Sequence, residues 1–178
     1  RLLRAAGIEV SEGACAQESA RLTAFFNTAM RNRRPFVALK AGMTLDGCTA
    51  TATGESKWIT SRSQRNAARN LRRLFDGVVV GIQTAIQDDP MLLPEPRTKR
   101  PFIRVVLDSH LRLPLKSRLV KSARRHPVIV VGTGPAAEHR RRALEGQGVM
   151  VLAVEGRGGR VSLNRALSAL FDHGLRSI

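Results

Sequence analysis

Aromatic side chains are scarce in this chain, which has no tyrosine, one tryptophan and six phenylalanines among 178 residues. Proteins that bind single-stranded nucleic acid or RNA stack the bases on aromatic side chains interleaved with basic ones. Such a platform is missing here, which disfavours a nucleic-acid partner. Long apolar runs are missing too: no stretch approaches the roughly 20 residues that a membrane-spanning helix needs, and we expect no membrane partner.

Cysteine is equally rare, with Cys15 and Cys48 far apart in the sequence and only four scattered histidines. Disulfide frameworks and four-ligand zinc sites need several such residues at short spacings. We therefore expect no metal site in this chain. Cysteines without a framework suit a reducing compartment, so the sequence favours a cytoplasmic location.

Acidic residues are also few: the chain has 14 of them against 30 lysines and arginines, so its net charge is +16. This balance favours an anionic partner. The candidate classes are nucleic acids, phosphorylated metabolites and phosphate-bearing cofactors. Most of the cations are arginines, whose guanidinium groups suit bidentate binding of phosphate. The charge alone does not choose among these partners.

The apolar residues that are present predict an alternation of strands and helices. A hydrophobic content of 43% is enough to bury a core in one domain. Helices are expected over residues 11–33, 61–75, 135–147 and 162–173, and the second of these begins with a capping box of Ser61 and Gln64. Strands are expected at residues 36–39, 49–53, 78–80, 102–107, 127–131 and 149–154, with a last one starting near Leu175. Such alternation implies an α/β fold with a largely parallel sheet.

The stretch VGIQTAIQDDPMLLPEPR, residues 80–97, is the most informative part of the sequence. An apolar strand, expected to be buried on both faces, runs into Gly81 and a short helical turn that contains Thr84. Asp88 and Asp89 should end this turn, and Pro90 biases Asp89 towards an extended conformation. Ligands of open α/β sheets bind at the carboxyl ends of the strands, so this stretch predicts a binding site.

Four further segments are candidates for the same edge of the sheet. Lys40 follows an apolar strand, where its ammonium either contacts a ligand or extends into solvent. Trp58 either lines a ligand site or packs its loop onto the sheet, and Ser109 follows the strand at residues 102–107. The loop at residues 132–135 forms either a phosphate site or a plain turn. The glycine-rich and arginine-rich loop at residues 156–160 is interpreted as solvated.

Several blocks together resemble one known family. LKAGMTLDG, GESKWITS, the arginine-rich helix ending at Arg72, GIQTAIQDDP and VLDSHLRLP occur in an order and spacing similar to the reductase domain of the bifunctional riboflavin-biosynthesis deaminase/reductase. The resemblance covers residues 35–178, which would be an incomplete reductase domain. Residues 1–34 resemble the tail of the preceding zinc deaminase domain, whose metal-binding motifs are absent from this chain.

The resemblance implies a dihydrofolate-reductase-like, three-layer fold: a mostly parallel mixed sheet with helices on both faces, truncated at its C-terminus because the family's acidic-Gly-Gly segment would follow Ile178. It also implies NADPH as cofactor, 5-amino-6-(5-phosphoribosylamino)uracil as the phosphorylated pyrimidine substrate, and a homodimer. The residues implied to contact the cofactor are Gly42, Trp58, Thr84, Asp88 and Ser109. Those implied to contact the substrate are Ser56, Arg72 and Leu92.

The sequence departs from the family at one substrate contact, where Glu95 replaces the usual arginine and Arg97 is the expected substitute. For catalysis, we expect Lys40 to orient or polarise the opened sugar and Asp88 to place the cofactor. Three alternatives stay open at this stage. They are a related pyrimidine or pteridine reductase of the same fold, a basic nucleic-acid-binding module, and a domain kept only for dimerisation.

Overall fold

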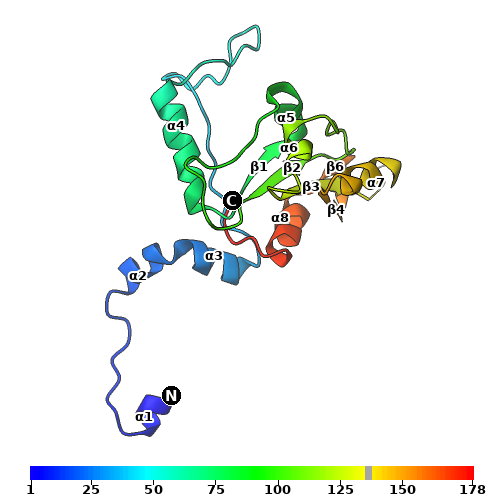
Figure 1. Cartoon of the computed structure of the whole chain (residues 1–178). Coiled ribbons are helices and arrows are strands. Elements are labelled where there is room, and N and C mark those ends of the chain that lie inside the picture. The colour runs from blue at the N-terminus through cyan, green and yellow to red at the C-terminus, as the bar shows by residue number, and fades with distance from the viewer. Residues whose placement is uncertain (135–137) are drawn as a thin grey trace.

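A parallel four-stranded sheet forms the centre of the molecule (Figure 1). The computed structural model describes residues 1–134 and 138–178. Strands β1 (Gly77–Gly81), β2 (Ile103–Leu107), β3 (Val128–Thr133) and β4 (Met150–Val154) lie side by side in sequence order. Each of the three neighbouring pairs is parallel. The four strands expected in this part of the sequence are therefore confirmed within one or two residues.

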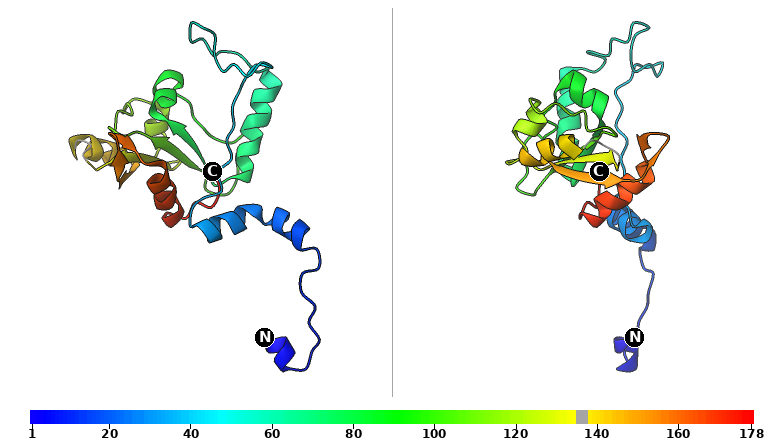
Figure 2. Two further views of the ribbon diagram at one scale, coloured as in Figure 1. Left: turned by 180° about the vertical axis from the view of Figure 1, so that it is seen from behind. Right: turned by 90° about the vertical axis from the view of Figure 1, so that its right-hand side faces the viewer.

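Helices cover both faces of this sheet, which gives three layers (Figure 2). On one face the core includes residues from α5 (Ile82–Asp88), α6 (Arg118–Lys121) and α7 (Glu138–Gly146). On the other face the core joins alternate residues of the strands to α8 (Leu163–Asp172). Strands β2 and β3 are largely buried because both of their faces are covered, as their continuous β-branched runs predict.

Strand β1 differs from the expectation of full burial. It lies at the edge of the four-stranded sheet, and its three valines are only half-buried. Strands were expected at residues 36–39 and near Leu175. The structure has a single parallel bridge there, between Phe36 and Ser177. Asp76 fastens this bridge to the start of β1, because its carboxylate accepts hydrogen bonds from the backbone of Arg176 and Ser177.

The N-terminal region consists of three short helices, where one continuous helix over residues 11–33 was expected. They are α1 (Leu2–Ala5), α2 (Ala16–Leu22) and α3 (Ala24–Asn32). Thr23 separates the last two, since its hydroxyl donates back to the carbonyl of Ser19, a contact that bends helices. Only α3 packs on the sheet domain, where Phe25 stacks on Phe36 and Phe75. Helix α1 lies far from the sheet (Figure 1).

Between Phe36 and helix α4 (Arg62–Leu71), the chain crosses residues 37–60 without a regular element, so the expected strand at 49–53 is wrong. Thr51 instead closes a turn with Glu55. Helix α4 begins at the predicted capping box, in which Ser61 and Gln64 exchange hydrogen bonds. It continues into η1 (Arg72–Leu74), which ends before Phe75.

The expected helix at residues 135–147 and the expected loop at 132–135 partly lie outside the described residues; in the described part, α7 begins at Glu138. The segment at residues 156–160 is exposed, as expected, but it folds into a small antiparallel hairpin of β5 (Gly156–Arg157) and β6 (Arg160–Val161) rather than an irregular loop. In the described ranges, no helix has both the length and the apolar character needed to cross a membrane.

Candidate active site

The carboxyl ends of strands β1 to β4 form one edge of the sheet, and the predicted cofactor residues Thr84, Asp88 and Ser109 follow directly after β1 and β2. Ser109 is the best-anchored of them. Its backbone carbonyl accepts hydrogen bonds from the amide and the hydroxyl of Thr133 at the end of β3, the latter at 2.8 Å. Its hydroxyl accepts the backbone amide of Val161 at 3.0 Å.

Asp108, next to Ser109, is fully buried and shapes this edge. One carboxylate oxygen accepts the amide of Leu113 at 2.7 Å, and the other is buried without a hydrogen-bond partner among the described residues. The side chain of Leu111 fills the space beside Gly132, where a Cβ would lie 2.9 Å from Leu111 Cδ2. Close packing of the 108–113 turn against β3 therefore fixes the position of Ser109.

Thr84 and Asp88 lie on helix α5, which begins directly after Gly81 and ends at Asp88 as expected. Asp89 is not extended, which corrects the prediction from Pro90. It adopts a left-handed conformation with φ 37° at the C-terminus of the helix. Aspartate tolerates this conformation, and here its carboxylate also accepts the amide of Arg118 at 2.8 Å.

Lys57 is a site residue that sequence reasoning missed. Its Nζ lies 2.7 Å from the Asp88 carboxylate, and this ion pair joins the exposed segment at residues 37–60 to the edge of the sheet. Both side chains stay about half exposed, so solvent screens the pair. The only hint in the sequence was the adjacency of Lys57 to Trp58, which does not reveal a partner 31 positions away.

Trp58 and Lys40 lie along the same segment. The indole is 70% exposed, and the guanidinium of Arg65 on α4 lies 4.1 Å from its ring centroid. Arg65 also donates to the carbonyl of Thr60. Lys40 Nζ lies beside Gly42 and Thr60, since a Cβ built on Gly42 would be 3.6 Å from that nitrogen and 3.5 Å from Thr60 Cγ2. Lys40 and Thr60 thus both lie near Gly42, and Lys57 of the same segment reaches Asp88, in an open arrangement.

The predicted substrate residues fall into separate places. Arg72 donates to the carbonyl of Leu93 at 3.0 Å, which brings it beside Leu92. Burial lowers the pKa of Arg72, and the positive charge of Arg69 lowers it further. Leu92 is buried in the core with φ 56°, so its side chain packs inside the sheet domain rather than in an open site. Ser56 is exposed in the segment at residues 37–60.

Arg97 lies elsewhere, in a groove of about 780 Å³ between α4 and the loop at residues 97–100. Other basic side chains of this groove are Arg73, Lys99 and Arg100. Glu95, which replaces the family's arginine, lies 3.6 Å from Arg69 in an exposed ion pair. The structure therefore keeps Arg97 in this groove, while Arg72 bonds to the backbone next to Leu92.

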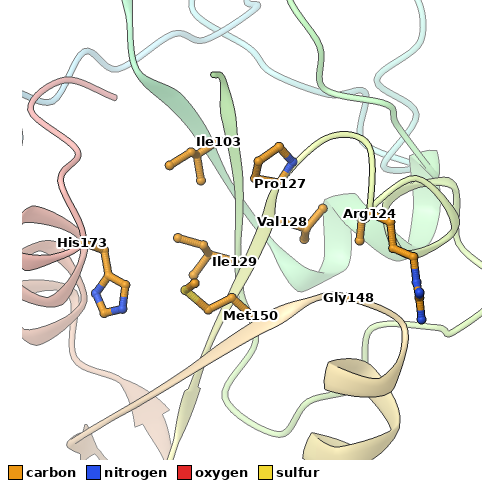
Figure 3. A pocket seen from close by; sticks show the side chains of 9 residues that line it. Ile103, Arg124, Pro127, Val128, Ile129, Gly148, Met150 and His173 are labelled. Atoms are coloured by element: carbon orange, nitrogen blue, oxygen red, sulfur yellow. The ribbon is translucent and has the colours of Figure 1, made fainter. Parts of the chain in front are cut away.

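A second cavity, of about 310 Å³, lies at the amino ends of strands β2 to β4, opposite the carboxyl edge that carries Thr84, Asp88 and Ser109 (Figure 3). Ile103, Val128 and Met150, from the amino ends of β2, β3 and β4, line it together with Arg124 and His173. None of the predicted site residues belongs to it. In residues 1–134 and 138–178, no three histidine, cysteine or acidic side chains gather closely enough to hold a metal ion.

Comparison with known proteins decides the family. A model of the RibD C-terminal domain matches residues 35–178. The chain belongs to this family. The RibD proteins of Aquifex aeolicus and Actinobacillus pleuropneumoniae, both named riboflavin biosynthesis protein, are 38% and 36% identical to it. The matches cover 86% and 99% of this chain but 43% and 46% of those proteins, so the chain spans about half the length of these RibD relatives.

Solved structures agree with this assignment. A diaminohydroxyphosphoribosylaminopyrimidine deaminase/5-amino-6-(5-phosphoribosylamino)uracil reductase from Thermotoga maritima matches 98% of this chain and 46% of its own, with a TM-score of 0.75 and 32% identity. Acinetobacter baumannii RibD matches 98% of this chain and 47% of its own, with a TM-score of 0.74 and 30% identity. The expected dihydrofolate-reductase-like fold of the RibD reductase domain is confirmed.

Proposed function

We propose that this RibD C-terminal domain reduces the ribose of 5-amino-6-(5-phosphoribosylamino)uracil to the ribityl form, with NADPH as the reductant. The observation that carries the proposal is the family match over residues 35–178. The Thermotoga maritima relative is named for both a deaminase and this reductase. We infer from it that the parent protein of this chain also has a zinc-dependent deaminase domain. From the rarity of cysteine we infer that it works in the cytoplasm.

The residues at the carboxyl edge of the sheet fit a nicotinamide dinucleotide. Ser109 accepts a hydrogen bond from Val161 and still has its own hydroxyl hydrogen to donate. Thr84 is exposed on α5, and a Cβ on Gly81 would meet no atom within 4 Å, so backbone and ligand can approach there. NADPH, when bound, supplies the hydride, and the protein supplies position and electrostatics.

The chain's own residues would prepare the substrate for that transfer. The ribosylamine ring must open to an imine, because hydride addition needs an electrophilic C1′. Protonation of the imine nitrogen makes C1′ electrophilic and supplies the proton that accompanies the hydride. In the proposal, the Lys40 ammonium hydrogen-bonds to the opened sugar and polarises it. Asp88, released from Lys57, holds the ribose or carboxamide of the cofactor. Arg72 binds the substrate phosphate, since its guanidinium has donors beyond the nitrogen that bonds Leu93.

Replacement of Lys40 by Met tests this role. Loss of a group that polarises the reacting sugar should lower turnover by about 100-fold or more. The dissociation constant for NADPH, measured by quenching of the single tryptophan, Trp58, should change less than about threefold. The matched control is Lys116→Met, which removes an exposed lysine elsewhere. Nearly unchanged turnover in Lys40→Met would show that Lys40 is an ordinary surface residue.

One relative favours a second substrate within the same reaction class. A 2,5-diamino-6-ribosylamino-4(3H)-pyrimidinone 5′-phosphate reductase from Methanothermobacter thermautotrophicus is 39% identical over 116 residues, which are 62% of this chain and 53% of that protein. Its name gives a substrate with an additional amino group. Side-by-side measurement of kcat/KM for the two pyrimidines distinguishes them, and a higher value for the diamino compound would replace our first choice.

We also propose a homodimer. Sedimentation equilibrium should give twice the chain mass of 19.5 kDa. A single species at the chain mass would overturn this part of the proposal.

A further inference from the structure

Two residues, Asp108 and Arg140, hold the turn that carries Ser109. The backbone carbonyl of Asp108 accepts the amide of Leu111 at 3.2 Å, and its carboxylate accepts the amide of Leu113 at 2.7 Å. Arg140 on α7 bonds to the carbonyls of the same two leucines. Its Nε donates to Leu111 at 3.0 Å, and its Nη2 donates to Leu113 at 2.9 Å. The backbone of both leucines is thus bonded to Asp108 through the amides and to Arg140 through the carbonyls.

Ser109 lies inside this turn. The hydrogen bond from the Leu111 amide to the Asp108 carbonyl closes a four-residue β-turn in which Ser109 is the second residue. Leu111, its last residue, is buried and has φ 52°, a left-handed conformation that is uncommon for residues other than glycine. Such a conformation persists only where the surrounding structure holds it. Loss of a bond to Leu111 would therefore let the turn relax and move Ser109.

Arg140 differs from the other arginines of its helix. Arg141 pairs with Glu145 on α7 itself, at 2.9 Å. Within the described part of the chain, the ion pairs found do not include Arg140, whose guanidinium donates to the turn instead. Leu144 fixes α7 in the same apolar cluster as the two leucines of the turn. Arg140 therefore holds the turn from a packed helix, with hydrogen bonds that its charge strengthens.

We propose that Arg140 is a positioning residue for the cofactor: by bonding to Leu111 and Leu113, it keeps the hydroxyl of Ser109 where that group contacts NADPH. This inference rests on the proposed function, in which Ser109 is a cofactor residue. Arg140 itself touches neither cofactor nor substrate. It acts on the geometry of the binding site before hydride transfer, so its loss should weaken binding of NADPH and leave kcat at saturating NADPH unchanged.

The test is a double-mutant cycle on NADPH affinity, measured by calorimetric titration. Arg140→Met removes both donors but keeps the apolar part of the side chain, and it should raise the dissociation constant about three- to tenfold. Ser109→Ala should raise it by a similar factor. The double variant Arg140→Met/Ser109→Ala should bind no more weakly than Ser109→Ala, because the same contact is lost in both. A purely structural role of Arg140 would instead multiply the two losses.

The matched control is Arg141→Met, which makes the same change in net charge one residue further along α7 and should leave NADPH affinity unchanged. Equal losses in Arg140→Met and Arg141→Met would mean that only charge matters, and would overturn the inference. If Arg140→Met does not fold in urea unfolding, Arg140→Lys replaces it in the cycle, since it keeps the charge but presents a single ammonium.

The remaining outcomes separate this inference from the proposed function. If Ser109→Ala lowers NADPH affinity and Arg140→Met does not, the inference is wrong and the proposed reductase stands. If Ser109→Ala binds NADPH as tightly as the unaltered chain, Ser109 is not a cofactor contact and the inference is wrong for that reason. If the unaltered chain binds no NADPH, the proposed function and this inference are both wrong.

Discussion

The sheet domain and the segment at residues 37–60 are held in very different ways, although the predicted site takes residues from both. In the sheet, Val105, Val106 and Val130 have no exposed surface. In the segment, Leu39 and Leu45 are 95% and 108% exposed. The first region is stabilised by burial of apolar area in two clusters, one on each face. The second has no comparable core.

Hydrogen bonds show the same contrast. Those within the segment are local turns, between Thr44 and Cys48 and between Thr51 and Glu55. Its contacts with the rest of the molecule are concentrated at its ends. Ala38 donates to the carbonyl of Ile178 at one end, and Lys57 and Trp58 contact Asp88 and Arg65 at the other. Segments with few buried contacts open at lower free energy than a core does.

The proposed site therefore has a rigid part on the sheet domain and a loosely held part on the segment at residues 37–60. Ser109 and Thr84 follow directly from strands of the core, so they are fixed before any ligand arrives. Lys40, Ser56 and Trp58 depend on a segment held at its ends. We therefore expect Thr84 and Ser109 to be preformed, and Lys40, Ser56 and Trp58 to become ordered when ligands bind.

The largest expected effect contrasts one leucine from each region. Leu170→Ala removes a side chain buried on α8 and leaves a cavity in the core, so the free energy of unfolding should fall by about 2 to 5 kcal/mol. Leu45→Ala, in the exposed segment, should change it by less than about 0.5 kcal/mol. Urea unfolding followed by circular dichroism measures both. Similar losses would show that the two regions share one core.

A buried arginine should give the next largest effect. Arg104 lies in β2 with no exposed surface and donates to Met91, Ser122 and His126, which ties three loops of the sheet domain together. Burial lowers its pKa to about 10, so its charge is costly to bury but is retained at neutral pH. Arg104→Met should lower the free energy of unfolding by about 1 to 3 kcal/mol, because acceptors lose charged donors.

Arg104→Lys is the matched variant for this test, since it keeps the charge but cannot reach several acceptors at once. It should fall between the original chain and Arg104→Met in urea unfolding. A more stable methionine variant would mean that the cost of burying the charge exceeds the value of its hydrogen bonds, as happens in some buried ionic networks. The hydrogen bonds of Arg104 would then not contribute to the rigidity of the sheet domain.

The sequence predicted the rigid region much better than the exposed one. Runs such as those of β2 and β3 are long and β-branched, and Ser61 with Gln64 is a local capping signal, so neighbouring residues suffice to identify these elements. The strands at 36–39 and 49–53 were predicted from equally apolar or β-prone residues. Strand formation depends on a partner strand, which the local sequence does not reveal. Here only Phe36 gains a bridge.

The parts of the site that sequence reasoning missed depend on contacts between distant residues. Lys57 pairs with Asp88, and Asp89 takes a left-handed conformation in which its carboxylate bonds to Arg118. The segment at residues 156–160 was interpreted as a solvated loop because it is a single glycine-rich and arginine-rich stretch between a strand and a helix. It is exposed, and its pairing into a hairpin was missed.

The smallest expected effect on stability concerns the ion pair that joins the two regions. Lys57→Ala should change the free energy of unfolding by less than about 1 kcal/mol, because both partners are about half exposed and screened by solvent. The local effect should be larger, since residues 56–60 lose their contact with α5. Amide hydrogen exchange of residues 56–60 should become faster, while that of β2 and β3 stays the same.

Asp88→Asn should have the same effect on exchange, and the double variant Lys57→Ala/Asp88→Asn should add little more, since one contact is lost in all three. Lys116→Ala, an exposed lysine in another loop, serves as the control and should leave exchange at 56–60 unchanged. Raised salt should reduce the difference between the original chain and Lys57→Ala, because screening weakens the pair without touching the core. If amide exchange became equally faster in the segment and in β2, the two regions would open as a single cooperative unit. The site would then have no preformed and induced halves.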